Sequence, residues 1–282
     1  MHIFYGKAQL IAHLNSSRFP DSTIGFVPTM GALHDGHLAL IARSLKENTF
    51  TVVSIFVNPT QFNNPDDLAK YPRTLEEDVR KITALNPKVL LYAPSVDDIY
   101  DSNPVSQSFD FDGLENQMEG KFRQGHFDGV GTIVKRLFEI VTPTNAYFGE
   151  KDFQQLQIVK KLVAKYSLPV TIIGCPIYRE ANQLAMSSRN ERLTLEERNQ
   201  ASVIYQTLIQ AKDIFQKENV AAAAQLVQQT FDKHPLFDLE YFVIADEETL
   251  LPCKDKEKNK NYRAFIAVFV NNIRLIDTIS LN

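Results

Sequence analysis

The sequence predicts an α/β fold with an open parallel sheet, followed by a smaller α+β domain. In the first two-thirds of the 282-residue chain, short and almost continuously apolar runs alternate with amphipathic helical patterns. Such runs are typical of strands that are buried on both faces of a parallel sheet, and the helices between them imply right-handed crossovers. The predicted strands are residues 24–27, 50–57, 89–92, 146–148 and 170–173.

Two of the segments between these runs repeat apolar side chains with the 3.6-residue period of a helix. They are residues 38–45 and residues 130–141. In an open α/β sheet, ligands bind beyond the carboxyl ends of the strands. We therefore expect functional residues directly after the predicted strands.

The last third of the chain has a different pattern. Residues 195–217 and 220–234 are predicted to be helices, and apolar runs at 239–244, 265–270 and 273–276 are predicted to be strands. Asn271 and Asn272 predict a tight turn between the last two strands, which would make them antiparallel. A polar stretch near residues 180–190 marks the expected boundary, giving domains 1–184 and 185–282.

Charge and composition restrict the classes of partner. The 30 basic and 34 acidic side chains give a net charge of −4, divided as −2 for residues 1–185 and −2 for residues 186–282. Because nucleic-acid-binding proteins concentrate basic charge, no nucleic acid partner is expected. The chain has no apolar run of about 18 residues, no signal-peptide pattern and only two scattered cysteines. We therefore expect a cytoplasmic protein without a membrane span.

The strongest chemical signal is PTMGALHDGH, residues 28–37, which follows a predicted strand and opens a predicted helix. The start of a helix offers unpaired N–H groups and a positive dipole end, which favour phosphate. His34 and His37 bracket this start, and both imidazoles can donate to phosphoryl oxygens that gain charge in a transition state. Gly31 and Gly36 allow the backbone to approach a ligand closely. The alternative is a loop with two surface histidines.

Three further clusters lie in segments where a ligand is expected, and each also has a plainer interpretation. Asn58 and Gln61 suit a small polar substrate, although Asn-Pro also starts ordinary turns. Lys151 places a positive charge at a strand-to-helix junction, although its acidic neighbours also favour a helix start. The Ser-Ser-Arg run at 187–189 can hold a polyphosphate or form a linker.

Taken together, these clusters resemble the motifs of a known enzyme superfamily and of one family within it. The His-x-Gly-His pattern resembles that of the nucleotidylyltransferase superfamily, which includes the class I aminoacyl-tRNA synthetases. The whole ordered set of motifs resembles the pantothenate synthetase family, the pantoate–β-alanine ligases, most clearly over residues 24–190. The matching segments are PTMGALHDGH, SIFVNPTQF, DLAKYPRTLEED, GHFDGV, YFGEKDFQQL and SSRN.

The resemblance implies a Rossmann-like N-terminal domain and a two-step reaction. Pantoate and ATP first give pantoyl adenylate and pyrophosphate. The amine of β-alanine then attacks the acyl carbon, which gives pantothenate and AMP. The family uses Mg²⁺ and is commonly a homodimer, so ATP, Mg²⁺, pantoate, β-alanine and a second copy of the chain are the implied ligands and partners.

The resemblance also implies roles for residues at the matching positions. His34, His37 and Lys151 are expected to act on the phosphates, with the two histidines mainly stabilising the transition state. The expected pantoate-binding residues are Asn58, Gln61 and Gln155. The expected ATP-binding residues are Met30, Gly31, Ala32, Leu33, His34, Asp35, Gly36, His37, Gly149, Glu150, Lys151, Asp152, Tyr178, Met186, Ser187, Ser188 and Arg189.

Two positions implied by the resemblance are less defined, and two segments depart from the family pattern. Arg123 falls in an expected flap, and Asp78 is a candidate to assist the metal, whose ligands stay unassigned. Many relatives have Asp-Gly where this chain has Asn182 and Gln183. Tyr178 replaces a small apolar residue beside the expected adenine site, which matters only if its side chain turns inward.

Two other functional classes remain as alternatives. A nucleotidylyltransferase acting on another small phosphate or carboxylate substrate would share the two histidines but would leave Asn58, Gln61 and Gln155 without a role. The second alternative is a protein related to a tRNA synthetase that binds RNA and is not an enzyme. The even charge distribution argues against the second alternative.

Overall fold

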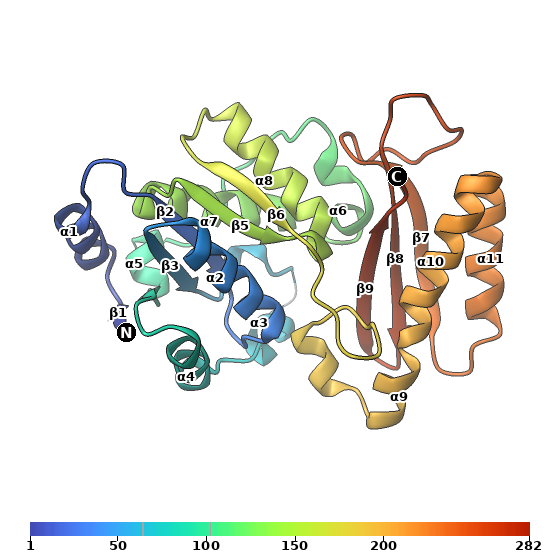
Figure 1. Ribbon diagram of the computed structural model, residues 1–282, viewed down its shortest axis with the longest axis horizontal. Coiled ribbons are helices and arrows are strands. Elements are labelled where there is room, and N and C mark those ends of the chain that lie inside the picture. The colour runs from blue at the N-terminus through green and yellow to red at the C-terminus, as the bar shows by residue number, and fades with distance from the viewer. Residues whose placement is uncertain (64, 102) are drawn as a thin grey trace. The chain divides into compact units, whose positions relative to one another are not determined.

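The computed structural model describes residues 1–63, 65–101 and 103–282, and it divides them into two compact units (Figure 1). The first unit is Met1–Cys175 and the second is Pro176–Asn282. The division falls earlier in the chain than the expected boundary at 184/185. Residues just after Cys175 make their contacts inside the second unit, because Arg179 pairs with Asp277 and Leu184 packs in the core of that unit. In the described part of the chain, no helix is both long and apolar enough to cross a membrane.

The first unit is built on a six-stranded, fully parallel sheet in the order β1-β4-β3-β2-β5-β6. The predicted parallel α/β architecture is therefore confirmed. Central strands such as β2 and β4 are almost entirely buried, as their continuous apolar sequences require. The strands are β1 (His2–Phe4), β2 (Ile24–Thr29), β3 (Phe50–Ile55), β4 (Leu90–Tyr92), β5 (Asn145–Gly149) and β6 (Thr171–Cys175).

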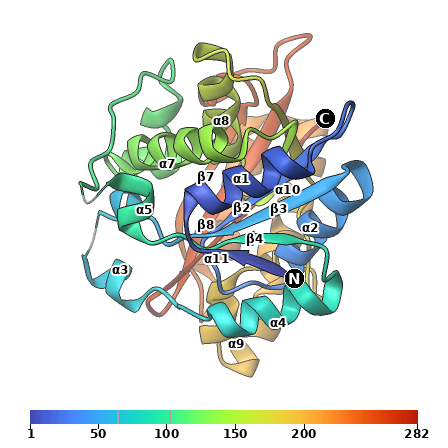
Figure 2. The same ribbon diagram turned by 90° about the vertical axis from the view of Figure 1, so that its left-hand side faces the viewer.

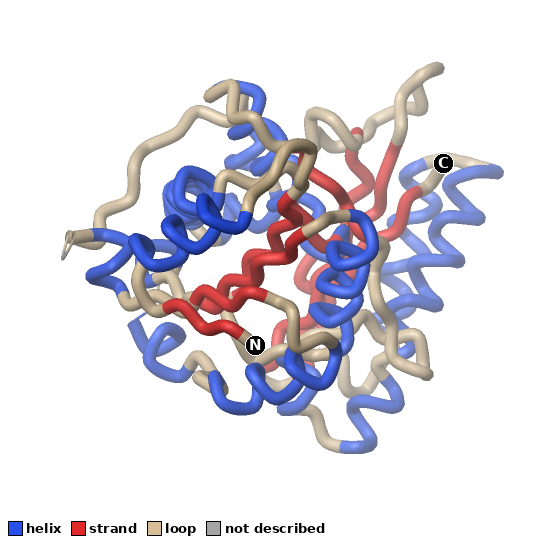
Figure 3. The backbone as a smooth tube through the Cα atoms, turned by 60° about the vertical axis from the view of Figure 1, so that its left-hand side comes forward, coloured by secondary structure: helices blue, strands red, loops and turns tan. Residues whose placement is uncertain are grey.

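Helices cover both faces of this sheet (Figures 2 and 3). In Figure 2, α1, α7 and α8 lie above the sheet, whereas α2 and α4 lie below it. The α-helices are α1 (Lys7–Ser17), α2 (Asp35–Glu47), α3 (Pro65–Lys70), α4 (Leu75–Leu85), α5 (Val96–Tyr100), α6 (Met118–Phe122), α7 (His126–Val141) and α8 (Phe153–Lys165). Short 3₁₀ turns are η1 (Pro59–Gln61), η2 (Leu114–Asn116) and η3 (Glu150–Asp152).

The strand order places a topological switch point between β2 and β5. Strand β2 pairs on one side with β3 and on the other with β5, although a long stretch of chain separates β2 from β5. The crossover helix α2 after β2 lies on one face of the sheet and α8 after β5 lies on the other. Ligands of open α/β sheets bind at such a point, beyond the carboxyl ends of the strands.

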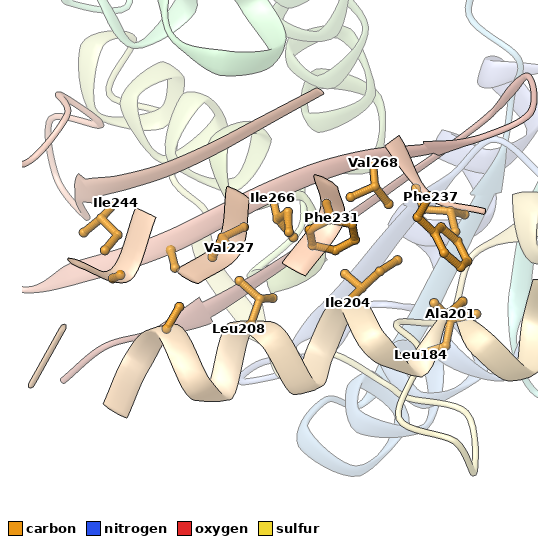
Figure 4. Close-up of a cluster of buried hydrophobic side chains, with 14 of the residues drawn as sticks. Leu184, Ala201, Ile204, Leu208, Val227, Phe231, Phe237, Ile244, Ile266 and Val268 are labelled. Carbon is orange, nitrogen blue, oxygen red and sulfur yellow. The ribbon is translucent and has the colours of Figure 1, made fainter. Parts of the chain in front are cut away.

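The second unit packs α10 and α11 against an antiparallel sheet in the order β7-β8-β9, and the short helix α9 precedes α10. Its strands are β7 (Asp238–Asp246), β8 (Tyr262–Val270) and β9 (Ile273–Ser280), and Val270 pairs with Ile273 across the predicted Asn271-Asn272 turn. Its helices are α9 (Leu195–Gln200), α10 (Ser202–Lys217) and α11 (Val220–Asp232), preceded by η4 (Ser188–Arg192). Apolar side chains from both layers, including Leu208, Val227 and Ile266, form its core (Figure 4). The predicted α+β character is confirmed.

Two elements differ from the sequence prediction. Strand β1 has only three residues, too few to show a period, and it is held by pairing with β4. The predicted helix 195–217 is two helices separated at Ala201. At this break, the Ser202 hydroxyl donates to the backbone carbonyl of Asn199, a local bond of the kind that competes with helix continuation.

Helix α7 packs directly on the backbone of η1, and Gly129 makes this contact possible. A Cβ atom at residue 129 would lie 2.4 Å from the carbonyl oxygen of Thr60 and 2.7 Å from the Cα of Gln61. Both neighbouring atoms belong to the backbone, so they cannot rotate away as a side chain can. The contact fixes the loop after β3 relative to the sheet.

Gly129→Ala is therefore expected to destabilise the protein by about 1–3 kcal/mol or more, because the added methyl overpacks a site that has no room. Gly6→Ala is the matched control, since the nearest atom to a Cβ there is 3.9 Å away. Urea unfolding of both variants measures the difference. Equal stability of the two variants would contradict this close packing.

Candidate active site

The loop after β2 brings the two predicted histidines together. His34 caps helix α2, and His37 is the third residue of that helix. The backbone N–H of His34 donates to Nδ1 of His37 at 3.3 Å, and the two ring centroids are 4.0 Å apart. Because Nδ1 of His37 accepts a hydrogen bond, the proton of its neutral ring is on Nε2.

Both imidazoles are held in the neutral form. Burial, together with the positive charge of Lys151, lowers the pKa of His34 to about 4. Burial, together with the nearby His34 and Lys151, lowers the pKa of His37 to about 3. A neutral imidazole can still donate one N–H to an anion. The pair therefore supplies neutral hydrogen-bond donors, while the positive charge at this site comes from lysine.

Lys151 reaches the same region from the neighbouring strand. It lies in η3, directly after β5, and its side chain is only 16% exposed. Its Nζ lies 3.8 Å from an oxygen of Asp152. The parallel pairing of β2 with β5 brings η3 and the histidine loop to the same edge of the sheet, where the charge of Lys151 lowers the pKa values of both histidines. Of the other expected residues in η3, Glu150 is partly buried, and Asp152 is exposed.

A buried carboxylate holds the loop that contains the first histidine. Asp78 is fully buried in the first turn of α4, and its two oxygens accept the backbone N–H groups of Ala32 and Leu33 at 3.0 and 2.7 Å. Gly31 has a φ of +84°, and a Cβ there would lie 3.1 Å from the Asp78 carboxylate. Lys81 donates to the carbonyl of Leu33 at 2.7 Å.

Sequence reasoning missed this role of Asp78. Three acidic residues in the first turn of a helix are ordinary, because they complement the helix dipole. Nothing in the sequence indicates which of them turns inward. Since both Asp78 oxygens accept backbone N–H groups, the carboxylate supports the loop.

The two amides predicted after β3 are in contact. Asn58 donates through Nδ2 to Oε1 of Gln61 at 3.2 Å, and both side chains are buried. His126, which begins α7, lies with Nδ1 2.9 Å from the carbonyl of Gln61. Because the carbonyl can only accept, this ring nitrogen carries the proton. Burial, reinforced by Arg123, lowers the pKa of His126 to about 4. No role was predicted for His126, although it lies in a matched motif.

Adjacent glutamines on α8 lie in different environments. Gln154 is buried, and its amide bonds to the backbone of the segment that contains η2 and α6. Gln155 is only partly buried, as a residue with a ligand-binding role would be. Arg123, the residue of the expected flap, follows α6 and is also partly buried.

The remaining predicted residues lie in the second unit. Tyr178 is 45% exposed, and its carbonyl accepts the N–H of Met186 at 3.0 Å. Ser187 caps η4, where its hydroxyl accepts the N–H of Arg189 at 3.3 Å. Ser188 and Arg189 begin that turn.

A hairpin turn of the second unit contains Asn182 and Gln183, the two residues expected to depart from the family pattern. Gln183 adopts a left-handed φ of 73°, a conformation that favours glycine. Asn182 stabilises the turn, because its Oδ1 accepts the N–H of Leu184 and its Nδ2 donates to the carbonyl of Arg198. The hairpin ends are fixed by the pairing of Arg179 with Ala185 and by the Arg179–Asp277 ion pair.

Comparisons with known proteins identify the family of the chain. A family model described as pantoate-beta-alanine ligase matches residues 2–280. The chain belongs to the pantoate–β-alanine ligase family. It is 63% identical to a pantothenate synthetase of Flavobacterium psychrophilum over all of both chains, and 50% identical to that of Christiangramia forsetii over all of both chains. The family predicted from the motifs is confirmed.

Solved structures of pantoate–β-alanine ligases share the fold over the whole chain. The pantothenate synthetase of Thermus thermophilus has a TM-score of 0.89 and 39% identity, covering 100% of this chain and 99% of that one. The ligase of Francisella tularensis, complexed with beta-gamma ATP and beta-alanine, has a TM-score of 0.80 and 37% identity, with coverage of 100% and 98%.

Asp78→Asn is expected to lower the free energy of unfolding by about 1–3 kcal/mol, because the new NH₂ group faces a backbone N–H and leaves a buried donor without an acceptor. Thr74→Val is the control, since it removes only one hydroxyl bond to the same carboxylate. Its cost should stay near about 1 kcal/mol, the net value of an ordinary hydrogen bond. Denaturant unfolding compares the two. A harmless Asp78→Asn would refute the proposed support of the loop.

The depressed histidine pKa values predict acid sensitivity. His34, His37 and His126 have folded pKa values below the unfolded value of 6.5, so their contribution to stability is present above pH 6.5 and is lost as the pH falls toward 4 and 3. Each group adds a slope of about 1.4 kcal/mol per pH unit to the free energy of unfolding where only the unfolded state binds the proton.

His37→Asn tests this slope while keeping an acceptor for the His34 N–H. Between about pH 4 and 6, the slope of the unfolding free energy against pH should fall by about 1.4 kcal/mol per pH unit, the amount due to one proton. The control is His2→Gln, which replaces an exposed histidine outside the site. Parallel curves for wild type and His37→Asn would show that His37 does not titrate as described.

Proposed function

We propose that the protein condenses pantoate with β-alanine to give pantothenate, with cleavage of ATP to AMP and pyrophosphate through a pantoyl-adenylate intermediate. The observation that carries this proposal is the neutral pair His34 and His37 beside Lys151, at the switch point of a chain that belongs to this ligase family. Such a group of donors stabilises charge on a phosphoryl group undergoing substitution.

In the first step, a carboxylate oxygen of pantoate attacks the α-phosphorus of ATP. The bond between that phosphorus and the bridging oxygen of the β-phosphate breaks, and pyrophosphate leaves. The two imidazoles donate N–H groups to phosphate oxygens, and Lys151 places its charge at the α-phosphate. These groups do not need to transfer a proton, because pantoate is already ionised at neutral pH.

In the second step, the amine of β-alanine attacks the acyl carbon. A C–N bond forms, the bond between the acyl carbon and the AMP oxygen breaks so that AMP leaves with the bonding electron pair, and the nitrogen loses a proton to water. Gln61 and Gln155 bind pantoate, and Gln61 lies next to the β-alanine position. Asn58 belongs to the same group of amides. It either contacts pantoate directly or supports Gln61 through their hydrogen bond.

The proposal assigns ATP contacts to residues of each unit, as the family resemblance implies. In the first unit these are residues 30–37 and 149–152, and in the second they are Tyr178 and residues 186–189. Ser187, Ser188 and Arg189 supply two hydroxyls and a guanidinium to the phosphates. The exposed ring of Tyr178 is not folded into the core of the second unit.

Mg²⁺ is assigned to the phosphates of ATP. Within the described residues, no three His, Cys, Asp or Glu side chains are grouped so that they could hold a metal ion. Mg²⁺ usually keeps several waters and binds through substrate phosphates with one or two carboxylates. We therefore propose that Mg²⁺ enters the site bound to the phosphates of ATP. We also propose a cytoplasmic location, which the two scattered cysteines favour, and a homodimer, as the family resemblance implies.

The reaction is tested by measuring AMP release from ATP and Mg²⁺ with pantoate, with β-alanine, and with both. AMP that forms only with both substrates, in equal amount to pantothenate, is the expected result. A stable dinucleotide product would instead indicate nucleotidyl transfer to another substrate. Release of pyrophosphate without pantoate dependence would show that pantoate is not the acid.

His37→Ala and Lys151→Ala are expected to lower kcat by roughly 10²–10³, because both groups act on charge that develops in the transition state. The exposed residues His2 and Lys160 provide matched alanine controls, which should keep the wild-type kcat. Thermal unfolding separates a lost catalytic role from a lost fold. Wild-type turnover of a folded Lys151→Ala variant would rule out its role at the phosphate.

A further inference from the structure

The side-chain amide of Asn58 is saturated by hydrogen bonds inside the protein. Its Nδ2 donates to Oε1 of Gln61 at 3.2 Å and to the backbone carbonyl of Gly129 at 3.1 Å. Its Oδ1 accepts the hydroxyl of Tyr100 at 2.6 Å and that of Thr60 at 3.2 Å. A primary amide has two N–H donors and two lone pairs, so this set uses its full capacity. Asn58 is also only 1% exposed.

Backbone groups set the orientation of this amide, and Tyr100 reinforces it. The phenol is buried at the end of α5, and burial raises its pKa, so the hydroxyl remains a donor. The carbonyl of Gly129 can only accept, and the backbone N–H of Thr60, 3.4 Å from Oδ1, can only donate, so these two groups distinguish the oxygen of the Asn58 amide from its nitrogen. The short hydrogen bond from Tyr100 then holds Oδ1 in place. Arg136 supports the tyrosine, because its guanidinium lies 4.9 Å from the ring centroid and donates to the carbonyl of Ile99.

The orientation of Asn58 in turn sets the orientation of Gln61. Since Nδ2 of Asn58 donates to Oε1 of Gln61, the opposite atom of that amide, Nε2, faces away from Asn58. Nε2 lies 2.9 Å from the sulfur of Met30, and a thioether is a weak acceptor that a substrate oxygen can replace. The backbone of Gln61 is held separately by His126 and by the packing of Gly129.

We propose that Asn58 is a positioning residue that does not touch the substrate, and that the chain Tyr100–Asn58–Gln61 makes Gln61 present an N–H donor to a carboxylate or hydroxyl oxygen of the substrate. This inference rests on the proposed function, in which Gln61 contacts pantoate. It divides the two pantoate-binding amides expected after β3, Asn58 and Gln61, into one that orients and one that binds. This orientation favours a carboxylate substrate. If the Gln61 amide were turned by 180°, its oxygen would face the anionic substrate and repel it.

A double-mutant cycle tests the inference with the full-length protein, using pantoate, β-alanine, ATP and Mg²⁺. Asn58→Asp removes both donors of Asn58 in a side chain of the same shape, and Gln61→Ala removes the group that Asn58 is proposed to orient. Each single variant is expected to raise the KM for pantoate about tenfold or more, with a smaller effect on the KM for ATP. The double variant should resemble Gln61→Ala alone, because residues that act through one contact are not additive.

Tyr100→Phe is a milder second variant, which keeps the inference testable if Asn58→Asp does not fold. Loss of the hydroxyl removes the shortest hydrogen bond to Asn58 and loosens its contact with Gln61, so the KM for pantoate should rise about three- to tenfold while kcat stays within about twofold. In a Gln61→Ala background the same substitution should have no further effect on KM. A purely structural role would lower thermal stability without this dependence on Gln61.

The outcomes separate the inference from the proposed function. The positioning role would be overturned if the enzyme forms pantothenate and the rise in KM for pantoate caused by Asn58→Asp or Tyr100→Phe multiplies with the rise caused by Gln61→Ala. That outcome would show that Asn58 reaches the substrate by itself. Failure of the wild-type protein to form pantothenate in the same assay would overturn the proposed function.

Discussion

The parallel pairing of β2 with both β3 and β5 is the constraint on which the site depends. Gly25 and Phe26 of β2 lie in register with Asn145 and Ala146 of β5, so both strands end at the same edge of the sheet. The loop with the two histidines and the turn with Lys151 then leave neighbouring strands. Because their crossover helices cover opposite faces, the two loops diverge, which is the arrangement that binds ligands in open α/β folds.

A layer of buried polar groups supports these loops. Asp78 accepts two backbone N–H groups behind the histidine loop, and Asn58 and His126 fix the amide and the carbonyl of Gln61. A buried polar group that loses its partner costs more than a hydrogen bond gains. Loops held in this way are therefore restricted to one geometry, which suits donors that must be oriented before a transition state forms.

The second unit uses the same principle in a short hairpin. Glu180 accepts hydrogen bonds from Asn190 and Arg198, and Arg179 is bidentate to Asp277. These bonds fix both ends of the segment that contains the Ser-Ser-Arg run. Asn182 and Gln183 stand within this frame where the family resemblance implies Asp-Gly, and Gln183 adopts the left-handed conformation that glycine favours. The turn therefore has a left-handed geometry without a glycine.

The sequence by itself determined the layered architecture and the position of the chemistry along the chain. Continuous apolar runs require strands buried on both faces, and loops after such strands are where ligand-binding residues gather. His34, His37, Lys151, Asn58 and Gln61 could be found in this way because each stands directly after a predicted strand. Their family could be identified because the motifs are long and ordered.

Only the tertiary structure decided which residues support the site and in which protonation state the two histidines act. Asp78 and Tyr100 come from helices α4 and α5, and neither stands out in its own segment. Their roles depend on which atoms meet after folding, and no local pattern records a contact between distant segments. The neutral state of the two histidines has the same origin, because burial and the approach of Lys151 set their pKa values.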